Sequence, residues 1–307
     1  MKKLMLRLPI YYLIVVLGMY FFQDFFIYYP EKSDAEIIEQ SAKNRNLRLW
    51  PDDVKTYRGF VKSGASQKSL GTILVFHGNA GNALDRTYYA SALSRLGYRV
   101  ILAEYPAYGS RPGKTSEKEF TADAIESTRL VLKEFGPPVY LLGESLGCGV
   151  VCGVVAKSNV TIDGVALITP WDSLSNLARS KYWFLPVRWM LKDSYDNVTN
   201  LSTYHGPIAV VMAGQDKIIP NRFTRRLYEA MQGPKRLWTF PQAGHNSWPS
   251  KPDESWWAEM MNFLHSIANT NGSTDLNPPP DEHPMAKKLR NFGTFFSVFE
   301  DKPQFLR

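Results

Sequence analysis

Cysteine is scarce in this chain of 307 residues, which contains only Cys148 and Cys152. Two cysteines cannot form a disulfide framework or supply the four ligands of a CxxC…CxxC zinc site. They also lie at positions i and i+4 of a predicted helix, where parallel side chains give poor disulfide geometry. We therefore expect both to be reduced, buried packing residues, and the sequence predicts neither a metal nor a cofactor.

Repeats and low-complexity patterns are also missing from the body of the chain. No segment recurs at a fixed period, and the 21 Gly and 20 Pro follow no triplet pattern. These absences exclude solenoids, propellers and collagen-like chains. With 44% hydrophobic and 21% charged residues, the chain is too apolar to be disordered, so it should fold as one large domain or two small ones.

Positive charge is not concentrated as it is in nucleic-acid-binding proteins. The net charge is +7, but Lys2, Lys3 and Arg7 supply part of it before the first apolar run. The densest remaining cluster, between Arg222 and Arg236, has neither an RNA-binding aromatic motif nor zinc-finger spacing. The sequence therefore predicts a solvated or lipid-facing basic surface and no nucleic-acid partner.

The N-terminus has the pattern of a membrane anchor. After the three cations, an uncharged apolar run extends from Leu8 to Gln23, and aromatic residues continue past Asp24 to Tyr29. Leu8 to Tyr29 is 22 residues, enough to span a bilayer at about 1.5 Å per residue, although Asp24 interrupts the run. No signal-peptidase site follows closely, so residues 1–29 are predicted to form an uncleaved anchor.

Such an anchor predicts where the rest of the chain lies. The positive-inside rule keeps the cationic end in the cytoplasm, so residues after Pro30 should face the other side of the membrane, the periplasm in a bacterium. The chain would then be a single-pass membrane protein. The alternative is a first helix buried in a soluble core, although such a helix rarely opens with three cations.

From residue 54 onward, short apolar or β-branched runs alternate with helical patterns. This alternation predicts an α/β fold, with a doubly wound, mostly parallel sheet and helices on both faces. Loops after the carboxyl ends of parallel strands gather at one edge of the sheet, where ligands bind. The predicted strands are 56–61, 72–76, 99–103, 139–142, 164–169, 208–213 and 236–240, and the predicted helices are 83–96, 116–135, 146–157, 222–231 and 253–267.

A nucleophile motif stands between one such strand and the next helix. Gly143-Glu144-Ser145-Leu146-Gly147 has the form G-x-S-x-G, directly after the apolar run VYLL and directly before a helical run. A serine on a tight strand-to-helix turn needs small neighbours, and the turn exposes its Oγ at the amino end of the helix. The motif therefore predicts Ser145 as a nucleophile.

An acid and a histidine follow in the loops after later strands. Asp216 comes after the strand PIAVVMA, and His245 comes after the strand RLWTF. Nucleophile, acid and histidine in this chain order are typical of α/β hydrolases. In such a triad His245 takes the proton from Ser145, and Asp216 holds the other ring nitrogen. Asp172, also just after a strand, is a competing candidate for the acid.

Acyl transfer also needs two backbone N–H donors for the oxyanion, one after the nucleophile and one from an earlier strand-end loop. These criteria indicate Leu146 and Asn79, the second within the loop His77-Gly78-Asn79-Ala80-Gly81-Asn82. His77 is predicted to brace this loop by hydrogen bonding. A phosphate-binding P-loop is excluded, because no Lys-Ser or Lys-Thr follows the glycines at the required spacing.

The chain resembles the α/β-hydrolase superfamily and, within it, membrane-anchored serine hydrolases related to the α/β-hydrolase-domain depalmitoylases. The resemblance covers about residues 28–268 and rests on YYP after the anchor, HGNAGN at 77–82, AEYPAYGSRPG at 103–113, GESLG at 143–147, GQDKIIP at 214–220 and AGHN at 243–246. It implies an eight-stranded type of sheet and hydrolysis of a carboxylic ester or thioester. Tyr105 and Gly109 match a Tyr-x-x-x-Gly turn near the pocket. Trp171 and Asp172 depart from the Phe and Thr that relatives often carry.

The predicted organisation is an anchor at 1–29, a catalytic domain at 30–268 and, at 269–307, a Pro-rich linker with a basic and aromatic tail. Residues of about 172–205 are rich in aromatic side chains and are interpreted as a short helical lid. An anchor and an apolar lid favour a small-molecule or lipid acyl ester as substrate. The alternatives are a serine peptidase with the same triad and a non-catalytic, membrane-anchored binding protein.

Overall fold

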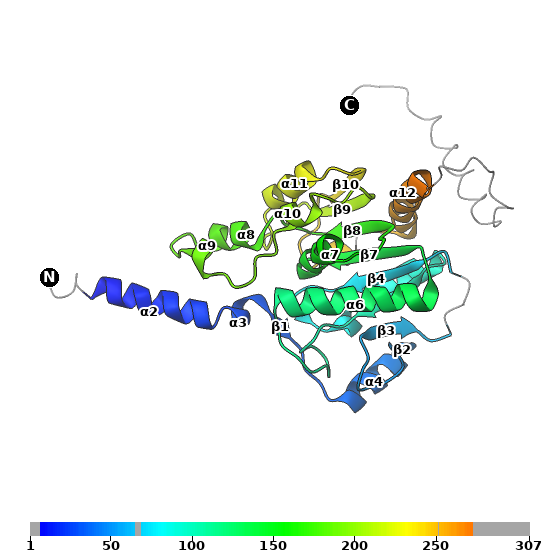
Figure 1. The fold of residues 1–307 in the computed structure, drawn as a ribbon, viewed down its shortest axis with the longest axis horizontal. Coiled ribbons are helices and arrows are strands. Elements are labelled where there is room, and N and C mark those ends of the chain that lie inside the picture. The colour runs from blue at the N-terminus through cyan, green and yellow to red at the C-terminus, as the bar shows by residue number, and fades with distance from the viewer. Residues whose placement is uncertain (1–6, 65–68, 251, 273–307) are drawn as a thin grey trace, which may run out of the picture. The chain divides into compact units, whose positions relative to one another are not determined.

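The computed structural model describes residues 7–64, 69–250 and 252–272. Its main sheet has eight strands in the order β10-β9-β8-β7-β4-β6-β3-β2 (Figure 1). β2 and β3 pair antiparallel, as do β3 and β6, and the other neighbours are parallel. The strands are β2 (Leu47–Trp50), β3 (Gly59–Lys62), β4 (Thr72–Phe76), β6 (Arg99–Ala103), β7 (Val139–Glu144), β8 (Gly164–Ile168), β9 (Ile208–Ala213) and β10 (Lys235–Phe240).

Helices cover both faces of this sheet, as predicted. On β4, alternate residues enter opposite cores: Leu74 packs with residues of one face, and Ile73 packs with residues of the other. This period of two is the geometry of an extended strand whose two faces are both buried. The first face carries α6 (Glu117–Phe135), α7 (Leu146–Lys157), α10 (Asn197–Leu201) and α11 (Asn221–Ala230), and the second carries α4 (Ala35–Asn44), α5 (Thr87–Arg95) and α12 (Glu254–Gly272).

Most predicted element boundaries agree with the structure, and the differences lie mainly near the N-terminus. The first predicted strand begins at Gly59 rather than residue 56, because residues 53–58 form a turn in which Asp53 accepts hydrogen bonds from Lys55 and Thr56. The predicted helix at 83–96 divides into a 3-10 turn (Ala83–Arg86) and α5. The sequence missed α4 and β2, whose short amphipathic patterns are weak signals.

The segment between β8 and β9 contains the helices of the predicted lid. They are α8 (Leu174–Lys181), α9 (Val187–Met190) and α10. Ser173 begins α8 as its N-cap, because its side chain accepts a hydrogen bond from the Asn176 N–H. Figure 1 shows α8 and α9 projecting from the sheet on the side where the first helices of the chain also lie.

The predicted transmembrane helix is not supported. The apolar N-terminal run forms α2 (Leu8–Phe21), which has 14 residues, followed by the short α3 (Asp24–Ile27). Within the described ranges, no helix has both the length and the apolar character needed to cross a membrane. The helix is interrupted at Phe22 and Gln23, where the buried Gln23 side chain forms hydrogen bonds with the lid. The alternative of a core helix is not supported either, since α2 buries none of its residues.

The residues that follow α3 are built into the α/β domain. Tyr28 is 3% exposed, and its hydroxyl donates to Asp193 at 2.5 Å. The two-residue strand β1 (Tyr29–Pro30) then pairs in parallel with β5 (Ala80–Gly81), which lies in the loop after β4. The end of the predicted anchor is therefore part of the folded domain. At the other end of the chain, α12 continues through residues 269–272 of the predicted linker, and the rest of the predicted linker and tail, from 273 onward, lies outside the described residues.

Replacing Tyr28 by Phe should destabilise the fold. Asp193 would lose the donor to one carboxylate oxygen and keep only the Glu117 N–H on the other. Because this carboxylate is buried, we expect the free energy of unfolding in urea to fall by about 1–3 kcal/mol. The matched control is Tyr29→Phe, an exposed neighbour that should change stability by less than about 0.5 kcal/mol. Equal effects of the two substitutions would contradict the buried role of Tyr28.

Candidate active site

Ser145 lies on the turn between β7 and α7, at the carboxyl edge of the sheet. Its backbone is strained, with φ of 51° and ψ of −115°. The turn closes only because its flanking residues are glycines. A Cβ on Gly143 would lie 2.5 Å from the Gly147 carbonyl oxygen, and a Cβ on Gly147 would lie 2.0 Å from the Phe76 carbonyl oxygen. The tight turn predicted around Ser145 is thus present, for the steric reason that the motif suggested.

The structure brings Asp216 and His245 to Ser145 from the ends of β9 and β10. His245 Nε2 lies 3.0 Å from Ser145 Oγ, and His245 Nδ1 lies 2.7 Å from Asp216 Oδ2. The other oxygen of Asp216 accepts the N–H groups of Ile218 and Ile219 at 2.8 and 2.7 Å. The Asp216 side chain is 2% exposed, so backbone donors hold it in one orientation toward the ring.

Asp172, the competing acid, has other partners. Its Oδ2 accepts hydrogen bonds from Asn176 Nδ2 and Arg226 Nη1, both at 2.8 Å, and its Oδ1 accepts the Ser173 N–H. These contacts join the start of α8 to α11. Asp172 is therefore placed to fix the base of the lid, whereas the ring of His245 faces Asp216.

The loop after β4 is held on several sides. His77 is buried, with Nδ1 2.8 Å from the Gly78 carbonyl oxygen and Nε2 3.0 Å from Glu104 Oε1, so it braces the loop as predicted. The Asn79 carbonyl accepts the Tyr29 N–H at 2.9 Å and the Tyr108 hydroxyl at 2.7 Å. These contacts fix the backbone of Asn79, whose N–H is a predicted oxyanion donor.

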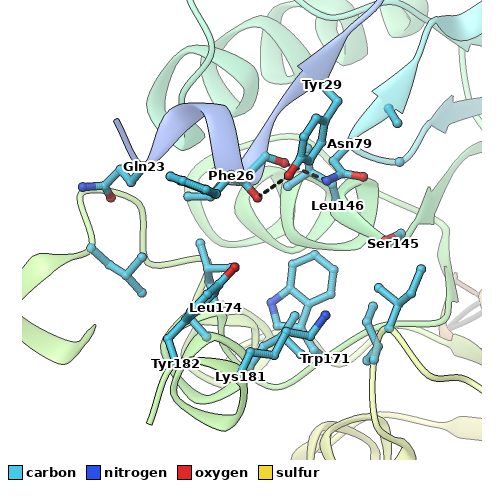
Figure 2. A pocket seen from close by; sticks show the side chains of 18 of the residues that line it. Gln23, Phe26, Tyr29, Asn79, Ser145, Leu146, Trp171, Leu174, Lys181 and Tyr182 are labelled. Carbon is cyan, nitrogen blue, oxygen red and sulfur yellow. Dashed lines mark hydrogen bonds between the residues drawn. The ribbon is translucent and has the colours of Figure 1, made fainter. Parts of the chain in front are cut away.

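The second predicted donor is the N–H of Leu146. Leu146 is the first residue of α7, and the first backbone N–H groups of a helix have no intrahelical acceptor. The positive end of the helix dipole also lies here. Figure 2 shows Asn79 and Leu146 beside Ser145 at one end of a cavity. The start of α7 therefore favours negative charge next to Ser145.

Glu144 makes a polar cluster that sequence reasoning missed. This residue of the G-x-S-x-G motif accepts hydrogen bonds from Arg86 Nε at 2.9 Å, the Tyr88 hydroxyl at 2.5 Å and the Tyr89 hydroxyl at 2.7 Å. Burial, and then the charge of Glu144, raise the pKa of both phenols well above the ordinary value, so they remain donors. The cluster fixes the strand residue before Ser145. Its only sequence signal was the carboxylate of Glu144 between an apolar strand and the turn.

The two cysteines pack behind the nucleophile turn. Both are free and buried, and Cys148 Sγ donates to the carbonyl oxygens of Gly143 and Ile168 at 3.1 and 3.2 Å. Burial raises the pKa of the Cys148 thiol well above its ordinary value, so it stays protonated. Among the described residues, no group of His, Cys, Asp or Glu could hold a metal ion.

A cavity of about 570 Å³ opens next to Ser145 and His245. It is within the usual size range of small-molecule sites, and its walls are mainly apolar. The predicted lid supplies one wall, as Figure 2 shows for Leu174 and Tyr182. The opposite wall comes from the N-terminal segment and includes Phe26. This segment was predicted to be part of a membrane anchor.

Comparisons with known proteins agree with this fold. The profile described as alpha/beta hydrolase fold matches residues 71–204. The chain is 34% identical over 205 residues to an uncharacterized protein of Mycobacterium tuberculosis, a match that covers 66% of this chain and 72% of that protein. It is 30% identical over 193 residues to the lysophosphatidylserine lipase ABHD12 of Danio rerio. That match covers 56% of this chain and 50% of the lipase, so it spans half the length of this relative.

A solved structure supports the same fold at low sequence identity. The esterase PF2001 of Pyrococcus furiosus superposes with a TM-score of 0.58 at 14% identity, covering 79% of this chain and 98% of that one. Together with the eight-stranded sheet and the helices on both of its faces, these matches confirm the predicted superfamily. The chain belongs to the α/β-hydrolase superfamily and is related to its ABHD members.

Proposed function

We propose that this hydrolase is a serine hydrolase that cleaves carboxylic esters or thioesters through an acyl-enzyme intermediate. The observation that carries the proposal is the hydrogen-bonded chain from Ser145 Oγ through the His245 ring to Asp216, with distances of 3.0 and 2.7 Å. A hydroxyl, a base and an orienting carboxylate in this arrangement activate a nucleophile.

The proposed mechanism has two halves. Ser145 Oγ attacks the acyl carbon while His245 Nε2 takes its proton, and the N–H groups of Asn79 and Leu146 stabilise the oxyanion. His245 then returns the proton to the leaving alcohol or thiol, which departs and leaves the acyl group on Ser145. In the second half, His245 takes a proton from a water molecule that attacks the acyl carbon, and then gives this proton to Ser145 Oγ as the bond to the acyl group breaks and the acid is released. Asp216 stabilises the imidazolium in both halves.

The cavity favours an apolar acyl group as part of the substrate. Its lining includes Trp171, Leu174 and Leu185, so moving a hydrocarbon chain from water into the cavity would lower the free energy of the bound state. One relative is named a lysophosphatidylserine lipase, and this name supports a lipid ester as the substrate. Amide cleavage by a peptidase is the second candidate, because the same triad serves both. Matched p-nitrophenyl esters and p-nitroanilides of one acyl group distinguish the two activities.

Labelling of the 307-residue chain with a fluorophosphonate probe should require both Ser145 and His245. The probe reacts with activated serines, so wild type should label and Ser145→Ala and His245→Ala should not. Ester hydrolysis should fall on the order of 10⁴-fold or more in each variant. A folded wild type that stays unlabelled would favour the non-catalytic binding protein instead.

The two candidate acids can be separated by Asp216→Asn and Asp172→Asn. Asp216→Asn should lower kcat on the order of 10⁴-fold, because an amide cannot stabilise the imidazolium. Asp172→Asn weakens the contacts with Arg226 and the start of α8, so its effect should fall mainly on thermal stability and KM. Stopped assays of kcat and KM with differential scanning calorimetry make the comparison. A larger loss of kcat in Asp172→Asn would assign the acid role to Asp172.

We also propose that α2 lies on the surface of a membrane and contacts its lipids without crossing the bilayer. Large apolar side chains remain exposed along it, among them Leu13 at 56% and Ile14 at 59%. On the lid, Trp183 and Trp189 are 82% and 84% exposed, and tryptophan favours the interface between lipid and water. The predicted position of the catalytic domain on the non-cytoplasmic side stays a prediction.

Co-flotation with phosphatidylglycerol vesicles tests the lipid contact. Leu13→Glu with Ile14→Glu should lower the bound fraction of the chain at least about tenfold, because two carboxylates would have to enter an apolar layer. Ile37→Glu is the control, since Ile37 is equally exposed at 55% but lies on α4. An unchanged bound fraction in the doubly substituted α2 variant would contradict the proposal.

A further inference from the structure

The walls of the cavity come from two segments that are far apart in the sequence. One is the N-terminal segment, residues 12–29, which contributes Met19, Gln23, Phe26, Ile27 and Tyr29. The other is the lid, which contributes Leu174, Leu177, Tyr182, Leu185 and Met190. In Figure 2, Gln23 and Phe26 face Leu174 and Tyr182 across the cavity, and Ser145 lies at one end of it. The cavity therefore depends on both segments.

Gln23 joins the two segments by its side chain. Its Nε2 donates to the Tyr20 carbonyl at 2.8 Å and to the Met190 carbonyl at 3.1 Å, while its Oε1 accepts the Lys192 N–H at 2.8 Å. Gln23 is 6% exposed, and these three bonds use both amide hydrogens and the oxygen. The side chain thus holds the backbone of the lid, and both of its amide hydrogens are already used and cannot be donated to a polar substrate group.

Apolar packing strengthens the same contact. Val16 and Met19 of α2 pack against the small lid cluster of Leu185, Val187 and Met190. The Tyr12 hydroxyl also donates to the Phe184 carbonyl at 2.9 Å. Of these residues, Met19, Leu185, Val187 and Met190 line the cavity, so its end beside Gln23, far from Ser145, has an apolar wall whose shape depends on α2.

The N-terminal segment also reaches the reacting end of the cavity. Asn79 Nδ2 donates to the Ile27 carbonyl at 2.8 Å, and the Asn79 carbonyl accepts the Tyr29 N–H at 2.9 Å. One continuous stretch of chain therefore contacts the loop of the proposed oxyanion donor and, a few residues earlier, the lid. A fragment that begins after Pro30 would lack both contacts.

We propose that the N-terminal segment is the wall of the acyl site and selects its substrate: a single hydrocarbon chain long enough to reach from Ser145 to the end of the cavity beside Met19. In this assignment Met19 is a specificity-determining residue, and Gln23 is a positioning residue that keeps the lid in place. The inference rests on the proposed acyl hydrolysis. It adds the length class of the acyl group, medium to long, and the segment that recognises it.

Filling this end of the cavity tests the selection of chain length. In Met19→Trp, the ratio of kcat/KM for p-nitrophenyl dodecanoate to that for the butyrate should fall about tenfold or more, since each methylene excluded from an apolar site costs several-fold. Leu17→Trp is the matched control, because Leu17 is 46% exposed on the same helix and does not line the cavity. An unchanged ratio in Met19→Trp would overturn the assignment of Met19.

Releasing the lid tests Gln23 by protease sensitivity as well as by kinetics. In Gln23→Ala, limited trypsin digestion at Arg179, Lys181 and Arg188 should accelerate about tenfold, because the lid backbone loses two hydrogen bonds to Gln23 and opens more often. KM for the dodecanoate should rise more than kcat falls. The control is Gln40→Ala, which removes an exposed side-chain bond to Asn44 on α4. Digestion of Gln23→Ala at the wild-type rate would overturn the positioning role.

The outcomes separate this inference from the function on which it rests. If wild type hydrolyses no ester and Ser145 is not labelled, the proposed function fails, and faster digestion of Gln23→Ala would still support the contact between α2 and the lid. If wild type is active but prefers butyrate over dodecanoate and Met19→Trp leaves that preference unchanged, the acyl-site inference fails and the serine hydrolase remains.

Discussion

The close approach of three backbone segments at the Ser145 turn is the constraint on which the site depends. β7, α7 and the end of β4 meet where Gly143 and Gly147 leave no room for a Cβ. This contact forces Ser145 to a positive φ and places it at the amino end of α7. Buried donors then fix the surroundings, since Arg86, Tyr88 and Tyr89 hold Glu144 next to the strained residue. Strain of this kind persists only where the structure around it is rigid.

A second constraint comes from the N-terminal segment, which contacts the α/β domain at two places. Tyr28 donates a hydrogen bond to Asp193, in the segment after α9, and the Tyr29 N–H donates to the Asn79 carbonyl in the loop after β4. Gln23 makes two hydrogen bonds with the lid backbone and a third with the Tyr20 carbonyl of its own helix. The apolar character that suggested a membrane anchor is thus used partly to line a cavity, while the outer surface of α2 stays exposed.

Local patterns predicted much of the fold. β4 and β6 lie at their predicted bounds because a buried parallel strand is a continuous apolar run between turn residues, which is a strong local signal. The chain order of Ser145, Asp216 and His245 was also readable, because each follows a strand and strand ends converge at one edge. α4 and β2 were missed because they are short and lie on the antiparallel side, where alternation with crossover helices gives no help.

The sequence by itself determined the α/β class, the superfamily and the set of residues that meet at the sheet edge, because these follow from periodicity and from motifs a few residues long. Only the tertiary structure shows that the His245 ring contacts Asp216, while Asp172, which also follows a strand, contacts Arg226. It also showed which contacts residues 12–30 make with the rest of the domain. An apolar run has the same composition whether it contacts lipid or a lid, and the difference lies in the bonds that Gln23 and Tyr28 make with residues about 165 positions away.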